Sequence, residues 1–320
     1  MLGALASLPS VPLAPEPTPI EELPRLGRVL GSRARLLVKR DDAIGFAFGG
    51  NKVRKMRLVA ADALERGADT LITSGGIQSN HARVTAAAAA KLGLRAILVA
   101  NGAPQERPSA NALLDRLLGA DVYYVAAREA RAPEMERLAG EVRARGGQPY
   151  VVPLGASTPL GAAAFVQAIH ELLEQIDPPD VIIHSTSSGG TQAGLVAGCA
   201  LAAVPTRVIG ISADESATSL EHTIRAILSG MGSLAGVPPS RFDRVAVEVD
   251  DRFVGGGYGV PSDESREAIE LTARTEAIFL DPTYTSKAMA GLIAYVRQRK
   301  FAVGQTIVFW HTGGQVGLFA

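Results

Sequence analysis

The 320-residue chain has a single cysteine, Cys199, and no excess of charge of either sign. One thiol cannot form an intrachain disulfide, so the fold depends on its apolar core and suits a reducing compartment. Lys plus Arg and Asp plus Glu both number 32, which argues against nucleic acid or an anionic membrane as a partner. Cys199 lies in an Ala- and Leu-rich run, where we expect a small buried residue.

Metal-ligand spacings and long apolar runs are missing as well. The five histidines show no paired ligand spacing, so the sequence predicts no metal site. No apolar run is long enough to span a bilayer, and the apolar, Pro-rich segment 1–15 lacks the basic start of a secretory signal. We therefore expect a cytoplasmic protein with no membrane partner, whose first fifteen residues form a loose arm.

Small and apolar residues are abundant, with 47% hydrophobic residues and 34 glycines. Short β-branched runs alternate with Ala- and Leu-rich amphipathic runs, a pattern typical of α/β proteins with mainly parallel strands. In the first half, the pattern predicts strands at 70–73, 96–99, 122–125 (all three buried) and 150–152, and helices at 52–66, 79–92, 109–118 and 133–145. In the second half, it predicts strands at 181–184, 208–212 and 306–310, and helices at 192–203, 217–231, 262–274 and 286–299.

The turn-rich segment 155–161 separates these two series and indicates a domain boundary. An early strand at 35–39 is expected to join the second sheet. The larger domain is then discontinuous in sequence.

The most informative motif is a lysine between glycines and a basic helix, residues 49–55 (GGNKVRK). A lysine at a loop-to-helix junction can act as a Schiff-base nucleophile, because the positive helix end and neighbouring cations disfavour its protonation. A basic residue at a helix start is more often solvated surface. Lys52 is therefore a candidate that needs support from the other motifs.

Two loops of small residues each follow a strand and open a helix. In residues 185–191 (STSSGGT), backbone N–H groups can converge on an anion at a helix N-terminus. The spacing matches neither a dinucleotide fingerprint nor a P-loop, so a cofactor monophosphate suits it better. In residues 75–81 (GGIQSNH), Ser79, Asn80 and His81 suit a substrate carboxylate; a plain helix N-cap is the alternative.

Three further segments offer hydroxyl and aromatic groups. Residues 281–287 (DPTYTSK) form a hydroxyl-rich turn, and the flexible loop 255–259 (GGGYG) presents Tyr258. Buried packing is the commoner role for a tyrosine. Residues 311–314 (HTGG) follow the last strand at its carboxyl end, where open α/β sheets bind ligands, and Thr312 offers a neutral hydroxyl there.

In this order, from about residue 26 to the C-terminus, the motifs resemble those of the D-cysteine desulfhydrase and 1-aminocyclopropane-1-carboxylate deaminase family. These are pyridoxal-phosphate enzymes of the tryptophan synthase β-like fold (type II). The resemblance implies two three-layer α/β/α domains with mainly parallel sheets. Residues 1–51 and 157–320 would form the larger, cofactor-binding domain and residues 52–156 the smaller one. It also implies a homodimer that uses pyridoxal 5'-phosphate and a small amino-acid substrate.

The resemblance also implies roles for individual residues. Lys52 would hold the cofactor covalently, and Asn80 would bind its ring hydroxyl. Residues 187–191 would cradle the phosphate, with Lys55 nearby. The cofactor contacts would thus come from Asn51, Lys52, Lys55, Asn80, Ser187, Ser188, Gly189, Gly190, Thr191, Thr285 and Thr312. Ser79, Asn80 and His81 would receive the substrate carboxylate, and Tyr258 and Tyr284 would flank the substrate. The catalytic group would be Lys52, Ser79, Tyr258 and Tyr284.

The reaction is indicated by two differences within the family. Members that open a cyclopropane ring carry Tyr-Glu where this chain has Tyr284-Thr285, and they lack a threonine at the position of Thr312. A neutral hydroxyl beside the pyridine nitrogen makes the ring a milder electron sink, which suits β-elimination. We therefore expect conversion of D-cysteine to pyruvate, ammonia and hydrogen sulfide.

Other activities stay open at this point. Thr283, Ser286 and residues 315–317 depart from the usual desulfhydrase residues, so the substrate is not fixed. Cysteate sulfo-lyase activity would be favoured by a basic side chain in the pocket, for which His81 is the candidate among the motif residues. The cyclopropane deaminase is a further alternative. A non-catalytic phosphate-ligand-binding protein would have no use for Lys52 or the clustered hydroxyls.

Overall fold

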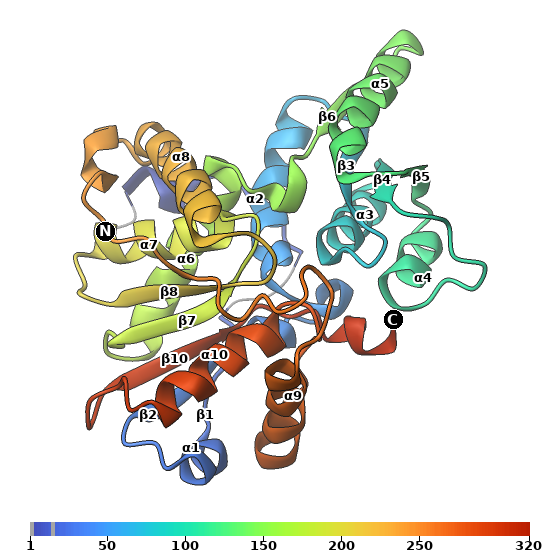
Figure 1. Cartoon of the computed structure of the whole chain (residues 1–320). Coiled ribbons are helices and arrows are strands. Elements are labelled where there is room, and N and C mark those ends of the chain that lie inside the picture. The colour runs from blue at the N-terminus through green and yellow to red at the C-terminus, as the bar shows by residue number, and fades with distance from the viewer. Residues whose placement is uncertain (1–2, 14–16) are drawn as a thin grey trace.

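The computed structural model describes residues 3–13 and 17–320, and it contains two β-sheets (Figure 1). The larger sheet has six strands in the order β1-β2-β10-β7-β8-β9 and is parallel except for β1. Its strands are β1 (Ile20–Glu22), β2 (Arg35–Arg40), β7 (Val181–Thr186), β8 (Arg207–Ser212), β9 (Glu248–Asp250) and β10 (Thr306–His311). The early strand β2 pairs with β10, so the expectation that it joins the second sheet is confirmed.

The smaller sheet has four parallel strands in the order β5-β4-β3-β6. They are β3 (Thr70–Gly76), β4 (Arg95–Asn101), β5 (Asp121–Val125) and β6 (Pro149–Val151). The prediction that β5 is buried is wrong: Tyr123 and Tyr124 are 37% and 41% exposed. An apolar run does not reveal whether its strand lies at an edge, and β5 pairs with β4 alone.

Helices cover both faces of each sheet (Figure 1). On the larger sheet, one face is covered by α6 (Pro159–Gln175), α7 (Gly190–Ala202) and α8 (Ala217–Ala235), and the other by α1 (Pro24–Leu30), α9 (Asp263–Glu276) and α10 (Thr285–Arg297). On the smaller sheet, α2 (Asn51–Glu65) and α3 (Asn80–Leu92) cover one face and α5 (Arg131–Ala144) the other, while α4 (Ala110–Leu117) packs against α3. The expected three-layer arrangement is present in both parts, which we call the larger and smaller lobes; the domain bounds at 51 and 157 stay a prediction.

Strand β7 shows why its sequence is apolar throughout. Ile182 packs into the core under α6, α7 and α8, whereas its neighbours Val181 and Ile183 pack into the core under α9 and α10. Successive side chains of a strand point to opposite faces, so a strand covered on both sides needs apolar residues at every position.

The N-terminal segment is packed, which makes the expected loose arm wrong for its described residues. Leu5, in the short helix η1 (Gly3–Ser7), is fully buried in the core formed by α6, α7 and α8. Val11 and Leu13 are buried in the core of the smaller lobe. Apolar residues in a Pro-rich segment thus serve as packing groups here. Residues 1–2 and 14–15 of the expected arm lie outside the described residues.

A buried ion cluster, formed by Lys39, Asp41, Arg54 and Glu171, fastens α2 to the larger lobe. Arg54 donates from Nε to Asp41 Oδ1 (2.9 Å) and from Nη1 to Glu171 Oε2 (2.7 Å). Lys39 pairs with the same Glu171, and Trp310 Nε1 donates to Asp41 Oδ2 (2.8 Å). Burial would raise the pKa of Glu171, but hydrogen bonds from Arg54 and Lys39 hold it at about 2.

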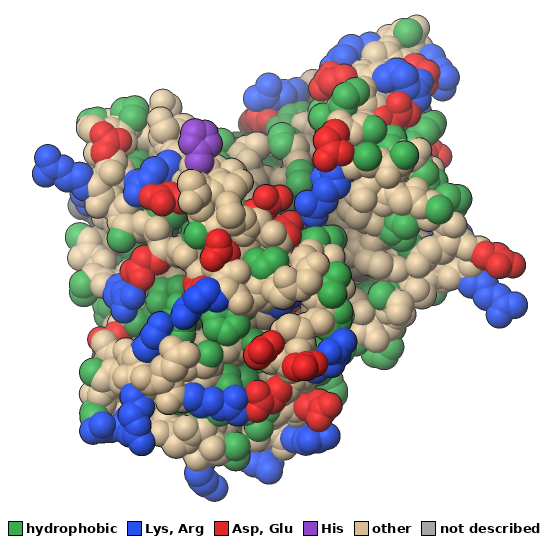
Figure 2. Space-filling model, viewed as in Figure 1, with side chains coloured by type: hydrophobic (Ala, Val, Ile, Leu, Met, Phe, Trp, Pro, Cys, Tyr) green, Lys and Arg blue, Asp and Glu red, His purple; other side chains and the backbone are tan. Residues whose placement is uncertain are grey.

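The surface carries no large field of one sign on the face in Figure 2, where acidic and basic side chains are mixed. This fits the equal numbers of acidic and basic residues. Within residues 3–13 and 17–320, no helix is long and apolar enough to cross a bilayer. Cys199 is buried as expected, and burial raises the pKa of its thiol to about 12.

Candidate active site

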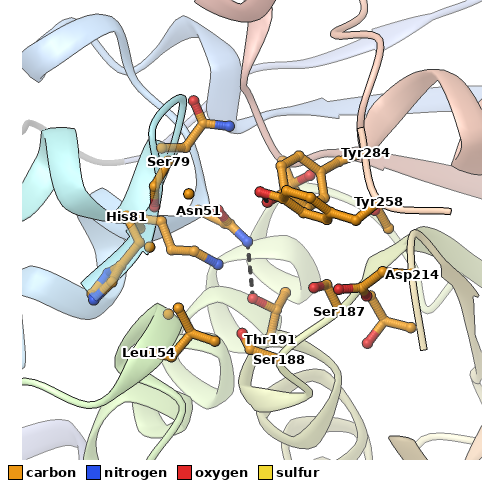
Figure 3. Close-up of a pocket in the computed structure, with 18 of the residues that line it drawn as sticks. Asn51, Ser79, His81, Leu154, Ser187, Ser188, Thr191, Asp214, Tyr258 and Tyr284 are labelled. Carbon is orange, nitrogen blue, oxygen red and sulfur yellow. Dashed lines mark hydrogen bonds between the residues drawn. The ribbon is translucent and has the colours of Figure 1, made fainter. Parts of the chain in front are cut away.

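The two lobes meet around one cavity, and a hollow separates them on the face in Figure 2. Its wall is built by the start of α2 and by the segments that follow β3, β7, β8 and β10 at their carboxyl ends. In Figure 3, Ser79 and His81 lie on one side, Tyr258, Tyr284 and Asp214 on the other, and Ser188 and Thr191 between them at the base. Motifs far apart in the sequence are therefore brought to one site.

Lys52 lies in the first turn of α2 and lines this cavity. The turn before Lys52 passes close to the segment after β10 and needs glycine at position 50. There φ is 102°, and a Cβ would lie 2.9 Å from the carbonyl oxygen of Thr312. The next residue, Asn51, donates its backbone N–H to that same oxygen (3.0 Å). Burial lowers the pKa of Lys52 from 10.5 to about 8. A neutral, nucleophilic amine is thus accessible near neutral pH.

A second group of residues, which we call the anion cradle, lies next to Lys52. It consists of Lys55, Gly155, Ser157 and the loop 187–191, which includes Gly190. Lys55 is fully buried and donates to Gly155 O (3.1 Å) and Ser157 Oγ (3.4 Å). Burial and the nearby Lys52 lower its pKa well below the usual value, and no described carboxylate pairs with it. A Cβ on Gly190 would come within 2.7 Å of Ser157 Oγ and 2.8 Å of Lys55 Nζ. No described carboxylate therefore places a negative charge in the cradle. The absence of a side chain on Gly190 leaves room there beside Lys55 and Ser157.

The loop 187–191 leaves the start of α7 without a side-chain cap. Gly189 occupies the N-cap with φ 76°. Ser187, Ser188, Gly189 and Thr191 line the cavity, and Asn51 Nδ2 donates to Thr191 Oγ1 (3.0 Å; Figure 3). Ser157 joins this loop through hydrogen bonds to Ser188 Oγ (2.8 Å) and from Gly190 N (3.2 Å). An anion at this position would meet a helix N-terminus, hydroxyls and a lysine.

The loop at the start of α3 has a different chemistry, because Ser79 caps the helix and accepts from Ala82 N (3.2 Å). The Asn80 Oδ1 atom accepts from Arg83 Nη1 (3.0 Å) and Asn111 Nδ2 (2.9 Å). These contacts leave the Nδ2 atom of Asn80 as its donor toward the cavity, which Asn80 lines. The buried Arg83 also donates to Gly49 O (3.0 Å) and so joins α3 to the lysine loop.

His81 lines the cavity but cannot serve as its basic group. Its Nε2 atom lies 2.8 Å from Thr73 Oγ1, and burial together with Lys52 and Lys55 lowers its pKa well below the usual value. The imidazole is therefore neutral at physiological pH. A neutral His81 would not supply a positive charge to a sulfonate.

Two tyrosines form a hydroxyl pair on the opposite wall. Tyr258 OH and Tyr284 OH are 2.6 Å apart, and their rings meet edge to face at a centroid distance of 5.8 Å. Burial raises the pKa of both phenols, and that of Tyr284 rises well above 10. Both hydroxyls are therefore protonated and can donate.

Thr285 does not belong to the cavity wall, in contrast to its expected cofactor contact. It is fully buried, and its Oγ1 atom donates to Asp281 Oδ1 (2.7 Å). Asp281 also accepts from Tyr284 N (2.8 Å) and so fixes the turn before α10. Thr312, by comparison, lines the cavity as expected.

Several lining residues were missed in the sequence. Asn101 ends β4, Arg128 and Arg131 follow β5, and Asp214 and Glu215 follow β8. Their positions after strand ends were the available signal, since ligands bind at the carboxyl edge of parallel sheets. Gly155, which lines the cavity, and Ser157, which joins the cradle, lie in the segment expected as a domain boundary.

Comparison with known proteins shows which family this geometry represents. Residues 11–313 match the family described as pyridoxal-phosphate dependent enzyme. The chain belongs to the pyridoxal-phosphate-dependent enzymes. It is 38% identical to a D-cysteine desulfhydrase of Klebsiella pneumoniae (strain 342) over 327 aligned residues, which cover 100% of this chain and 98% of that relative.

Solved structures agree with this membership. An ACC deaminase homologue has a TM-score of 0.91 and 37% identity, with 99% of this chain and 95% of the other covered. A threonine deaminase from Solanum lycopersicum has a TM-score of 0.71 and 20% identity, with 97% and 82% covered, and supports the fold alone. The type II fold expected from the sequence is confirmed.

The cavity fits the cofactor of the pyridoxal-phosphate-dependent enzymes. The cradle has a buried lysine that forms an ion pair with no described carboxylate, and a small-residue loop, and both suit a phosphate dianion. The second lysine, Lys52, has a lowered pKa that suits covalent attachment to an aldehyde. Pyridoxal 5'-phosphate is thus the cofactor of this protein.

Proposed function

We propose that the protein is a lyase that carries out β-elimination on a small β-substituted amino acid, with D-cysteine as the substrate. The products are pyruvate, ammonia and hydrogen sulfide. The observation that carries the proposal is that Lys52 lines one cavity together with the loop 187–191 of the anion cradle, the Ser79–Asn80 loop and the tyrosine pair. The name of the Klebsiella relative supports the choice of substrate.

Several groups of the chain would hold the cofactor. Lys52 would bind it covalently, and the cradle of Lys55, Ser187, Ser188, Gly189, Gly190 and Thr191 would hold its phosphate. Asn51 supports the cradle through Thr191. Asn80 Nδ2 would donate to the ring hydroxyl, and Thr312 would be the neutral partner of the ring nitrogen; both residues line the cavity. When bound, pyridoxal phosphate withdraws electrons from the substrate Cα and makes its proton acidic.

The chain's own groups then move the protons. Ser79 and Asn80 orient the substrate carboxylate at the start of α3. The Lys52 amine, once released, takes the Cα proton on Nζ, and the Cβ–S bond breaks with both electrons on sulfur. Tyr284, which is protonated and paired with Tyr258, donates a proton to the departing sulfur. Water completes the conversion to pyruvate and ammonia.

Cyclopropane ring opening has less support in this chain. The family members that open the ring carry a carboxylate near the pyridine nitrogen, whereas position 285 is a threonine bonded to Asp281 away from the cavity. Thr312 offers a hydroxyl only. The alternative of a non-catalytic phosphate-binding protein is set aside by the family membership.

The test is release of pyruvate and sulfide from D-cysteine by the purified protein with added pyridoxal phosphate. We expect equal amounts of both products, and none with L-cysteine. Release of neither product by cofactor-loaded protein would overturn the D-cysteine assignment.

We also propose a cytoplasmic homodimer with the two domains bounded at residues 51 and 157. The family resemblance supports the dimer, and the single cysteine supports the reducing compartment. Light scattering coupled to size-exclusion chromatography tests the first, and a monomer of 33.3 kDa would contradict it.

A further inference from the structure

The fully buried Lys287 has no part in the reaction as proposed. It lies in the first turn of α10, and its Nζ atom donates to three backbone carbonyl oxygens. These belong to Ala213 (2.9 Å), Val254 (2.8 Å) and Gly257 (2.7 Å). Three acceptors use all three N–H donors of an ammonium group, so the contacts fit the charged form of lysine. Lys287 thus joins the start of α10 to the end of β8 and to the loop between β9 and α9.

This loop carries Tyr258 and has few other contacts to fix it. Four of the five residues 255–259 are glycine, which loses more conformational freedom on ordering than any other residue. The backbone hydrogen bonds of the loop join residues three positions apart within it, at 3.2–3.4 Å. In the part of the chain that the structure describes, only Lys287 Nζ and the Tyr258 hydroxyl join residues 254–260 to other segments by hydrogen bonds.

Both members of the tyrosine pair depend on where Lys287 lies. Gly257 O belongs to the peptide group that precedes Tyr258, so its bond to Nζ fixes the backbone directly beside this ring. Tyr284 is the N-cap of α10, three residues before Lys287. The two hydroxyls are 2.6 Å apart, and a hydrogen bond weakens steeply as its geometry departs from the optimum. A loop released from Lys287 would therefore lose the pair.

We infer that Lys287 is a positioning residue that anchors the loop 254–260 and so holds Tyr258 against Tyr284 for proton donation to the leaving group. The inference rests on the proposed β-elimination. Lys287 lies behind the cavity wall rather than in it, so its effect on the reaction passes through the tyrosine pair. Loss of Lys287 should then matter in proportion to the need of the leaving group for a proton.

Two substrates differ in that need. In both, Lys52 Nζ takes the Cα proton, and the bond from Cβ to the leaving atom breaks with both electrons on that atom. Sulfur takes up a proton as it departs from D-cysteine, whereas chloride, the anion of a strong acid, departs from β-chloro-D-alanine without one. Water completes both reactions to pyruvate and ammonia, so no oxidant or reductant is needed.

The experiment assays pyruvate from each substrate with the holoenzyme. Lys287→Met removes the ammonium group and keeps the length of the side chain. We expect kcat/KM for D-cysteine to fall about 10- to 100-fold, within the contribution of a general acid, and kcat/KM for β-chloro-D-alanine to fall by less than about threefold. Lys300→Met, at an exposed lysine beyond the end of α10, is the matched control and should change neither value.

Removal of the Tyr258 hydroxyl tests whether Lys287 acts through the pair. Tyr258→Phe should lower the ratio of the D-cysteine kcat/KM to the β-chloro-D-alanine kcat/KM. The addition of Lys287→Met should then lower this ratio no further, because both substitutions remove the same function. An equal fall for both substrates in Lys287→Met, or additive losses in the double variant, would overturn the inference.

Hydrogen exchange measured by mass spectrometry makes the test independent of turnover. We expect the amides of residues 254–260 to exchange at least about tenfold faster in Lys287→Met holoenzyme than in wild type. In Tyr258→Phe they should exchange at the wild-type rate, because Lys287 still holds the loop. Unchanged exchange in the first variant or fast exchange in the second would overturn the inference, and the second decides alone if Lys287→Met does not fold. If wild type acts on neither substrate, the proposed β-elimination fails, and exchange still decides whether Lys287 anchors the loop.

Discussion

The start of α3 and the start of α7 have the same local architecture and different chemistry. Each follows the carboxyl end of a central parallel strand with a loop of small residues. Ser79 caps α3 with its own side chain, whereas Gly189 leaves α7 without a side-chain cap. The first loop presents side-chain groups to a ligand, and the second presents backbone and a positive helix end. A strand–loop–helix unit therefore acquires its ligand through the residue at the N-cap.

Removing the amine of Lys52 has the largest expected effect on activity. Lys52→Ala lowers kcat/KM by about 10⁴-fold or more, because covalent attachment and the proton acceptor are both lost. The cradle is intact, so the variant still binds the cofactor without a covalent bond, and borohydride no longer fixes it. Lys91→Ala, at the exposed end of α3, is the control. A fully active Lys52→Ala enzyme would contradict the site.

The second-largest effect is expected from adding a side chain at the start of α7. Gly190→Ala places a Cβ within 2.8 Å of Lys55 Nζ and of Ser157 Cα, so the cradle must shift. We expect cofactor affinity to fall about 100-fold, in the range of a lost charged contact. Equilibrium dialysis measures it. The matched control is Gly140→Ala in α5, where an added Cβ meets nothing within 4 Å; similar affinities for both variants would refute the cradle.

The pH dependence of the rate of cofactor binding tests whether the pKa of Lys52 is lowered. Burial lowers the pKa of Lys52 to about 8, so the amine is protonated below this pH and neutral above it. The rate of capture by cofactor-free protein should rise about tenfold per pH unit below 8 and level off above it. Stopped-flow absorbance gives the profile. A rise that continues to the usual lysine pKa of 10.5 would show that the amine is not desolvated.

The smallest effect is expected at the cap of α3. Ser79→Ala costs about 1 kcal/mol of unfolding free energy, because the Ala82 N–H loses its acceptor. It should also raise KM for the amino acid while cofactor affinity stays close to wild type. Ser216→Ala removes the equivalent cap of α8, at a residue that is not part of the cavity wall, and should cost similar stability without a change in KM. Equal KM values for the two variants would mean that Ser79 is a cap alone.

Local sequence was enough to predict both loops, because a strand followed by small residues and a helix places its loop at a known edge of the sheet. It was not enough for Arg128 and Arg131, whose place depends on how the smaller lobe faces the larger one. Thr285 shows another limit: its position in the motif is right, but a hydrogen bond to Asp281 turns the side chain away from the cavity. The same holds for β5, where the sequence could not indicate an edge position.

The pairing of β2 with β10 has a consequence for how the protein is made. Lys52 and its loop are synthesised long before β10 and Thr312, whose carbonyl oxygen accepts the Asn51 N–H. Until they emerge, β2 has no partner on the side of the sheet that leads to β7. The reactive lysine therefore stays without its final surroundings until β10 is made, and an incomplete chain that ends before residue 306 lacks the strand and the Thr312 carbonyl that position the lysine loop.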